Sequence, residues 1–141
     1  MGDVQKIKRK MVKGSTKLIY STDFPVETIS NLASIKIITN ELRERLKDKN
    51  WGFDYPKMVE MYFSDMYISL VNIFDLLVDG GACVLVVGDQ TIAGVILPVA
   101  EILAELSEMI GFRQNSIELH RERRSTGHDI PIPEENLVLI K

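Results

Sequence analysis

Apolar residues recur three and four positions apart in three segments of the chain, a spacing typical of helices that bury one face. The predicted helices cover residues 26–47, 57–77 and 98–110. The second helix has the longest apolar stripe, which consists of Val59, Phe63, Met66, Leu70, Ile73 and Leu77. The piece SIKIIT inside the first helix is rich in β-branched residues and could form a strand instead.

Short apolar runs between these helices predict strands at residues 16–20, 82–88, 112–121 and 136–141. The run 82–88 is bounded by glycines and delivers a carboxylate, Asp89, at its C-terminal end. The segment 123–134 (RRSTGHDIPIPE) has the composition of a loop. We therefore expect the last two strands to be joined by this loop.

The order of these elements predicts an α/β fold. Strands that alternate with helices favour a parallel sheet with helices on its faces. The last two strands have no helix between them, so we expect them to pair as an antiparallel β-hairpin. Residues 1–15 are polar and basic, and we expect them to form an arm ahead of a single domain, residues 16–141.

The composition excludes several classes of protein. The chain has 141 residues, 45% hydrophobic and 26% charged, as in an ordinary soluble domain. The net charge of −3 argues against a protein that coats nucleic acid by bulk attraction, although a local basic patch stays open. The single cysteine, Cys83, excludes an intramolecular disulfide, and His120 and His128 alone do not indicate a metal site. No apolar stretch could cross a bilayer and no signal-peptide core is present, so we expect a cytoplasmic protein without membrane partners.

The order and spacing of short motifs resemble the C-terminal half of class I S-adenosylmethionine-dependent methyltransferases, and most closely the DNA-modification amino-methylases. The matching pieces are Tyr62-Phe63-Ser64-Asp65-Met66, Gly80-Gly81, Val86-Val87-Gly88-Asp89, Gly111-Phe112, Arg121 to His128, and Glu135 to Lys141. The resemblance covers residues 55–141 well and residues 16–30 weakly. It implies a partial Rossmann-like fold, S-adenosylmethionine as cofactor and a DNA or RNA substrate.

Two departures from the family pattern limit what the resemblance implies. The family has a glycine-rich cofactor loop, whereas the only glycines before residue 52 are Gly2 and Gly14. The acidic ribose contact after the family's second strand is absent too. The catalytic Asp/Asn/Ser-Pro-Pro-Tyr/Phe motif is degenerate here and would correspond to Asp23 and Phe24, without the paired prolines. We therefore expect a chain that is inactive alone and binds the cofactor only with a complementary subunit.

Each candidate site residue has a structural alternative. Asp23 would otherwise cap the next helix from a turn, and Phe24 would be a core residue. Asp89 would stand at the edge of a ligand pocket, since ligands of doubly wound sheets sit beyond the carboxyl ends of strands. Alternatively, it closes a turn by accepting from the amide of residue 91 or 92.

Basic residues cluster once outside the arm, and they are Arg121, Arg123, Arg124 and His128. They would bind nucleic-acid phosphates or form a solvated loop. Three functions stay open: a methyltransferase-related protein, a non-catalytic dimerisation module, and a nucleic-acid-binding subunit. Strand 16–20 would present an unpaired edge, so we expect a homodimer with this strand at the interface.

Overall fold

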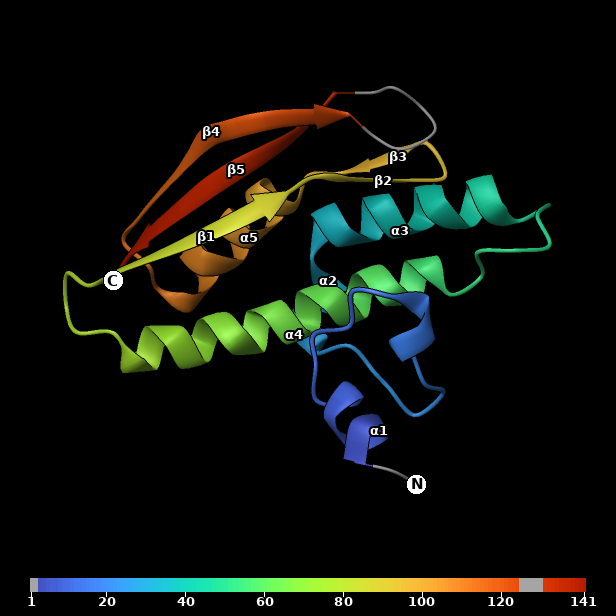
Figure 1. Ribbon diagram of the computed structural model, residues 1–141, viewed down its shortest axis with the longest axis horizontal. Helices are drawn as coiled ribbons and strands as arrows, with labels where there is room; N and C mark the ends of the chain where they lie inside the picture. Colours follow the sequence, from blue (N-terminus) through green and yellow to red (C-terminus); the bar gives the residue numbers. More distant parts are fainter. Residues whose placement is uncertain (1–2, 125–130) are drawn as a thin grey trace. The chain divides into compact units, whose positions relative to one another are not determined.

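The computed structural model describes residues 3–124 and 131–141 (Figure 1), and the chain divides into two compact units, Met1–Met66 and Tyr67–Lys141. The first unit contains α1 (Asp3–Lys8), the 3-10 helix η1 (Thr16–Leu18), α2 (Glu27–Asn31), α3 (Ala33–Leu46) and the start of α4 (Tyr55–Leu76). The second contains the end of α4, then β1 (Ala82–Gly88), β2 (Gln90–Ile92), β3 (Val95–Leu97), α5 (Val99–Ile110), β4 (Gln114–Arg124) and β5 (Pro131–Ile140).

The described residues of the first unit form helices and connecting turns, without a strand. The predicted helix 26–47 is present, but Leu32 has extended geometry (φ −67°, ψ 126°) and divides it into α2 and α3. The strand alternative for SIKIIT is wrong, because these residues lie in α3, where Ile35 and Ile38 are buried on the same face as Leu42. The period of the apolar positions outweighs the local β propensity here.

The predicted strand 16–20 is also wrong. Residues 16–18 form η1, in which Leu18 N donates to Ser15 O at 2.9 Å. The Ser15 side chain accepts from Lys17 N at 3.4 Å and so acts as the N-cap. A strand needs a neighbouring strand for its backbone groups, and the described part of this unit contains none.

The second unit is built on a three-stranded antiparallel sheet in the order β1-β5-β4. Leu137 of β5 lies between Leu85 of β1 and Ile117 of β4, so β5 is paired on both edges. The antiparallel pairing of the last two strands is confirmed. The predicted loop 123–134 is wrong at residues 123–124 and 131–134, which lie in β4 and β5, and its residues 125–130 lie outside the described residues.

The unit is therefore mixed α/β with an antiparallel sheet. β1 and β4 run in the same direction because both pair antiparallel with β5. Parallel neighbours, which the sequence predicted, do not occur among the described strands, since β5 separates the two strands that could have formed them. A short hairpin of β2 and β3, not predicted from the sequence, precedes α5.

Helix α5 covers one face of this sheet (Figure 1). Asn115 and Leu139 are directly opposite each other in the register and so share a face, and Asn115 donates to Glu108 of α5. On the other face, the side chains of Val84 and Val86 are 58% and 64% exposed. The sequence predicted helices on both faces of the sheet. On the face opposite α5, the residues of β1 are exposed instead.

Lys141 joins the end of the sheet to the end of α4. Its Nζ donates to the backbone oxygens of Phe74 at 2.6 Å and Leu77 at 2.8 Å, and lies 4.5 Å from the centre of the Phe74 ring. A cation is stabilising at the carbonyl end of a helix. Gly80, with φ +76°, then turns the chain toward β1.

The variant Lys141→Met should lower the free energy of unfolding by about 1–3 kcal/mol, because two helix carbonyls lose a charged donor. Urea denaturation followed by circular dichroism measures this change. Lys49→Met is the control, since Lys49 is exposed and its replacement should change stability by less than about 0.5 kcal/mol. Equal effects of the two substitutions would contradict the capping role.

Candidate functional site

Asp89 lies at the carboxyl end of β1, and its carboxylate holds the start of α5. Oδ1 accepts a hydrogen bond from Val99 N, in the first residue of α5, at 2.8 Å. The N-cap residue, Pro98, makes no side-chain cap. Asp89 therefore supplies the acceptor that the helix start requires. The hydrogen bond predicted from the amide of residue 91 or 92 is wrong, because the carboxylate accepts from Val99 N, ten residues along the chain.

The surroundings of Asp89 oppose its ionisation. Burial raises the pKa of Asp89, and the charge of Glu101 adds to this, while the amide of Val99 and the guanidinium of Arg123 favour the charged form. The pKa of Glu135 is raised as well, by burial first and then by Asp89 and Glu101. A raised pKa is common in acid–base catalysts, but here the carboxylate of Asp89 is committed to α5.

Glu134 holds two of the predicted phosphate-binding arginines. It forms ion pairs with Arg121 Nε and, at 3.3 Å, with Arg123 Nε. Arg123 Nη2 also donates to Asp89 O at 2.9 Å. The buried Arg123 Nε has no hydrogen bond among the described residues despite its distance from Glu134, so that contact is an ion pair without hydrogen-bond geometry. The hydrogen bond from Arg121 lowers the pKa of Glu134.

The basic cluster is therefore a feature of the strands. Arg121, Arg123 and Arg124 belong to β4, and His128 lies outside the described residues. The side chain of Arg121 is 67% exposed and that of Arg123 is 37% exposed. The positive charges of Arg121 and Arg123 are paired with the carboxylate of Glu134, and this pairing weakens their attraction for a phosphate.

Gly88 makes room for this network. A Cβ at Gly88 would lie 3.2 Å from Glu134 Cγ and 3.4 Å from Arg123 Nη2. The first distance is tighter than ordinary van der Waals contact, so the Glu134 side chain would have to shift by a few tenths of an ångström, while the second is at the limit of ordinary contact. The Gly88-Asp89 pair thus has a structural role at this end of the sheet.

Asp23 and Phe24 lie on a turn of the first unit. The sequence predicted the turn, but not the partners of these two residues. Asp23 Oδ2 accepts from Tyr20 N at 2.9 Å, and Asp23 N donates to Tyr20 O at 3.1 Å. Asp23 does not cap the next helix, because the N-cap of α2 is Val26, whose N donates to Ser64 Oγ at 3.1 Å. Phe24 is 78% exposed and is not a core residue.

Side chains that the sequence reasoning missed surround this turn. Lys57 Nζ donates to Tyr20 O at 2.8 Å and lies 5.8 Å from the centre of the Phe24 ring. The guanidinium of Arg9 lies 4.5 Å from the centre of the Tyr20 ring. The sequence contains one signal for these contacts, which is the basic N-terminal segment followed by aromatic residues.

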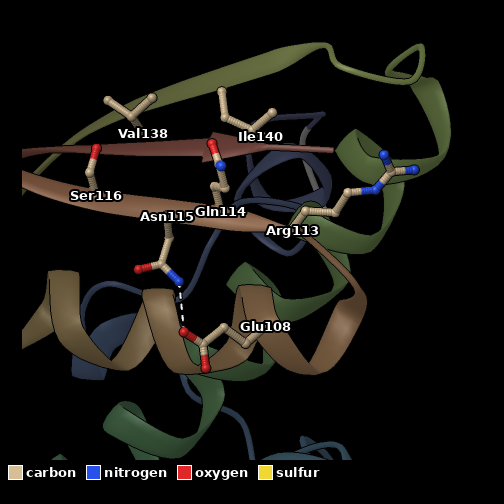
Figure 2. A pocket seen from close by; sticks show the side chains of 7 residues that line it. All are labelled: Glu108, Arg113, Gln114, Asn115, Ser116, Val138 and Ile140. Atoms are coloured by element: carbon tan, nitrogen blue, oxygen red, sulfur yellow. Dashed lines mark hydrogen bonds between the residues drawn. The ribbon is translucent and has the colours of Figure 1, made fainter.

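A hollow of about 420 Å³ lies at the opposite end of the sheet from Asp89 (Figure 2). It is lined by Glu108, Arg113, Gln114, Asn115, Ser116, Val138 and Ile140. Ile140 pairs with Ala82, the first residue of β1, which fixes this end. Asn115 points toward Glu108 and donates to it at 2.8 Å, so the polar lining is partly satisfied internally.

No group of three or more His, Cys, Asp or Glu residues suited to a metal ion occurs within residues 3–124 and 131–141. Among the same residues, no helix has the length and apolar character needed to span a membrane. Comparison of the chain with protein-family models, curated proteins and solved structures finds no match.

The variant Asp89→Ala should cost about 1–2 kcal/mol of stability through loss of the helix cap. Asp89→Asn keeps an acceptor oxygen and should cost less. Because the pKa of Asp89 is raised by folding, the folded state binds more protons than the unfolded state above the ordinary pKa of aspartate, about 4. The stability of the original protein relative to Asp89→Asn should therefore fall as the pH rises through that window.

Urea unfolding of both variants between about pH 4 and pH 7 tests the cap and the charge separately. A stability difference from Asp89→Asn that is independent of pH would contradict the raised pKa. An Asp89→Ala variant as stable as Asp89→Asn would contradict the cap.

Proposed function

We propose that this chain is related to the S-adenosylmethionine-dependent methyltransferases that modify DNA or RNA, and that it does not bind the cofactor tightly alone. The observation that carries the proposal is the place of the resembling motifs. Gly80-Gly81 follows the end of α4, Gly88-Asp89 follows the body of β1, and Gly111-Phe112 follows α5. These three motifs lie at the ends of a helix, a strand and a helix, in the order that the resemblance implies, and this order supports the proposal.

In this proposal the sheet of the second unit is part of a Rossmann-like fold. β1 and β4 run in the same direction, as strands of such a fold do, and β5 is reversed between them. Ligands of open α/β sheets bind beyond the carboxyl ends of the strands. Asp89 lies at that end and would stand at the edge of the pocket, where its carboxylate positions α5.

In this proposal the target base binds at the turn that carries Asp23 and Phe24, the degenerate catalytic motif. An exposed ring such as Phe24 is free to stack on a base. One carboxylate oxygen of Asp23 is occupied by Tyr20 N, which leaves it poorly placed to accept from a target amino group. With the paired prolines and the glycine-rich loop absent from the sequence, methyl transfer would require a complementary subunit.

Titration of the purified chain with S-adenosylmethionine by calorimetry should detect no binding tighter than about 100 μM, equivalent to roughly −5.5 kcal/mol. The physical reason is that a close approach of backbone to the cofactor needs a glycine-rich turn. A dissociation constant well below this value would overturn the statement that the chain does not bind cofactor alone.

The relationship itself is tested by co-expression with the product of the neighbouring reading frame. Transfer of labelled methyl groups from S-adenosylmethionine to DNA or RNA by the co-purified proteins, and by neither alone, is the expected result. Failure of every neighbouring product to support transfer would favour a non-catalytic role.

A second candidate function, dimerisation, rests on the edge of β1. Among the described strands, β1 pairs only with β5, and residues 82–88 contain neither charge nor proline to protect the other edge. Antiparallel pairing with a second copy about Leu85 would place Val84 opposite Val86 of that copy. This edge replaces strand 16–20 as the proposed interface, since residues 16–18 form η1.

Sedimentation equilibrium at micromolar concentration should give the mass of a dimer. The double variant Val84→Lys with Val86→Lys should be a monomer, because like charges would face each other across the two-fold axis. Both side chains are exposed, so the fold should tolerate the change. Leu119→Lys, at a residue 62% exposed on β4, is the matched control and should stay dimeric. A monomeric original protein would reject this candidate.

A further inference from the structure

Cationic and aromatic side chains alternate on the first unit. Arg9 lies over the ring of Tyr20, with 4.5 Å from the guanidinium carbon to the ring centre. Lys57 Nζ lies 2.8 Å from Tyr20 O and 5.8 Å from the centre of the Phe24 ring. We call these four residues, Arg9, Tyr20, Lys57 and Phe24, the cation–aromatic row.

The row is accessible to a ligand. Phe24 is 78% exposed and Arg9 is exposed, while Tyr20 and Lys57 are partly exposed. A base can stack on the open ring of Phe24, and cations beside the rings can contact the phosphates on either side. Single exposed apolar residues are common on proteins, but here each of two rings has a cation beside it, Arg9 at Tyr20 and Lys57 at Phe24.

The charge distribution of the chain favours a polyanion at this row. Residues 3–17 carry six Lys or Arg and one acid, Asp3. Of these cations, only Lys13 forms an ion pair with a described residue, Asp65, at 3.4 Å. A polyanion would therefore meet cations that, apart from Lys13, form no ion pair with a carboxylate among the side chains that the structure describes.

The second unit has the opposite character. Residues 1–66 carry 12 Lys and Arg against 9 Asp and Glu, whereas residues 67–141 carry 5 against 11. Arg121 and Arg123 of the second unit are already paired with Glu134. The overall net charge of −3 conceals this asymmetry.

We propose that the cation–aromatic row, with the lysines of residues 3–17, binds single-stranded nucleic acid. A base stacks on Phe24, and Arg9, held over the Tyr20 ring, and Lys57 contact phosphates. A duplex keeps its bases stacked on each other and cannot offer their faces to the rings. This inference rests on the proposed function for the base contact at Phe24, and it adds Arg9 and Lys57 as the groups that contact the phosphates of a single strand.

An anionic membrane is the other polyanionic surface that a basic segment could meet. Val4 and Ile7 of α1 are exposed beside the lysines. However, α1 has only 6 residues, which gives a short apolar face. The exposed aromatic ring beside a cation fits a base better, so the membrane is treated as an outcome of the test.

The test measures fluorescence anisotropy of labelled oligo-dT and oligo-U of about 16 nucleotides with the full chain, at several salt concentrations. Phe24→Ala should weaken binding about 5- to 100-fold, the loss of one stacked base. Phe24→Tyr keeps the ring and should restore most of the affinity. The double variant Arg9→Ala with Lys57→Ala should weaken binding and reduce the slope of log K against log salt by about 0.7 for each lost phosphate contact.

The matched control is the double variant Arg121→Ala with Arg124→Ala, which removes the same charge from the second unit. It should leave affinity and salt slope unchanged. Circular dichroism and urea midpoints should be unchanged in Phe24→Ala and Phe24→Tyr, because the side chain is exposed. These two variants therefore decide the question even if loss of Lys57 loosens the turn at Tyr20.

Three results would overturn the proposal. The first is the absence of oligonucleotide binding at low salt, or binding only to vesicles that contain phosphatidylserine. The second is loss of affinity in the Arg121 and Arg124 control with none in the Phe24 variants, which would show that the nucleic acid binds at β4. The third is tighter binding of the corresponding duplex than of the single strand. None of these results bears on the cofactor titration, so the two proposals fail separately.

Discussion

The pairing of β5 on both of its edges is the constraint on which the second unit depends. Its backbone groups are satisfied by β1 on one side and β4 on the other, so its register fixes both neighbours. One end of β5 brings Pro133 O to the amide of Asp89 at 3.1 Å. The other end leads to Lys141, whose Nζ caps α4. The strand thus positions the helix start at one end of the sheet and the helix end at the other.

This arrangement explains why the polar residues of the second unit offer little to a ligand. Asp89 is bonded to the start of α5, Glu134 is paired with Arg121 and Arg123, and Asn115 donates to Glu108. A polar group that is already satisfied gains little from an incoming partner, because the new contact must replace an existing one. The first unit differs, since most cations of its N-terminal segment have no carboxylate partner among the described residues.

The sequence predicted local elements well and pairing poorly, for a physical reason. The helices α4 and α5 and the strand β1 carry their own apolar period or run, and they form near the predicted residues. The segment 16–20 has strand composition but no strand partner in its unit, and it forms η1 instead. Three features depend on partners that no local pattern specifies. They are the insertion of β5 beside β1, the three-residue strands of the β2–β3 hairpin, and the hydrogen bond between Asp89 and Val99.

The motif residues that carry the family resemblance have structural partners in this chain. Ser64 accepts from the amide of Val26, Asp65 pairs with Lys13, and Lys141 caps α4. Motifs of this kind report how a chain folds, whereas function depends on the groups that a site presents. Arg9 and Lys57 lie outside every motif, yet Arg9 lies over the Tyr20 ring and Lys57 lies 5.8 Å from the centre of the exposed Phe24 ring. Lys57 already donates to Tyr20 O and Arg9 lies over the Tyr20 ring, so the exposed ring of Phe24 is the group of this surface that an incoming base could cover without replacing a hydrogen bond.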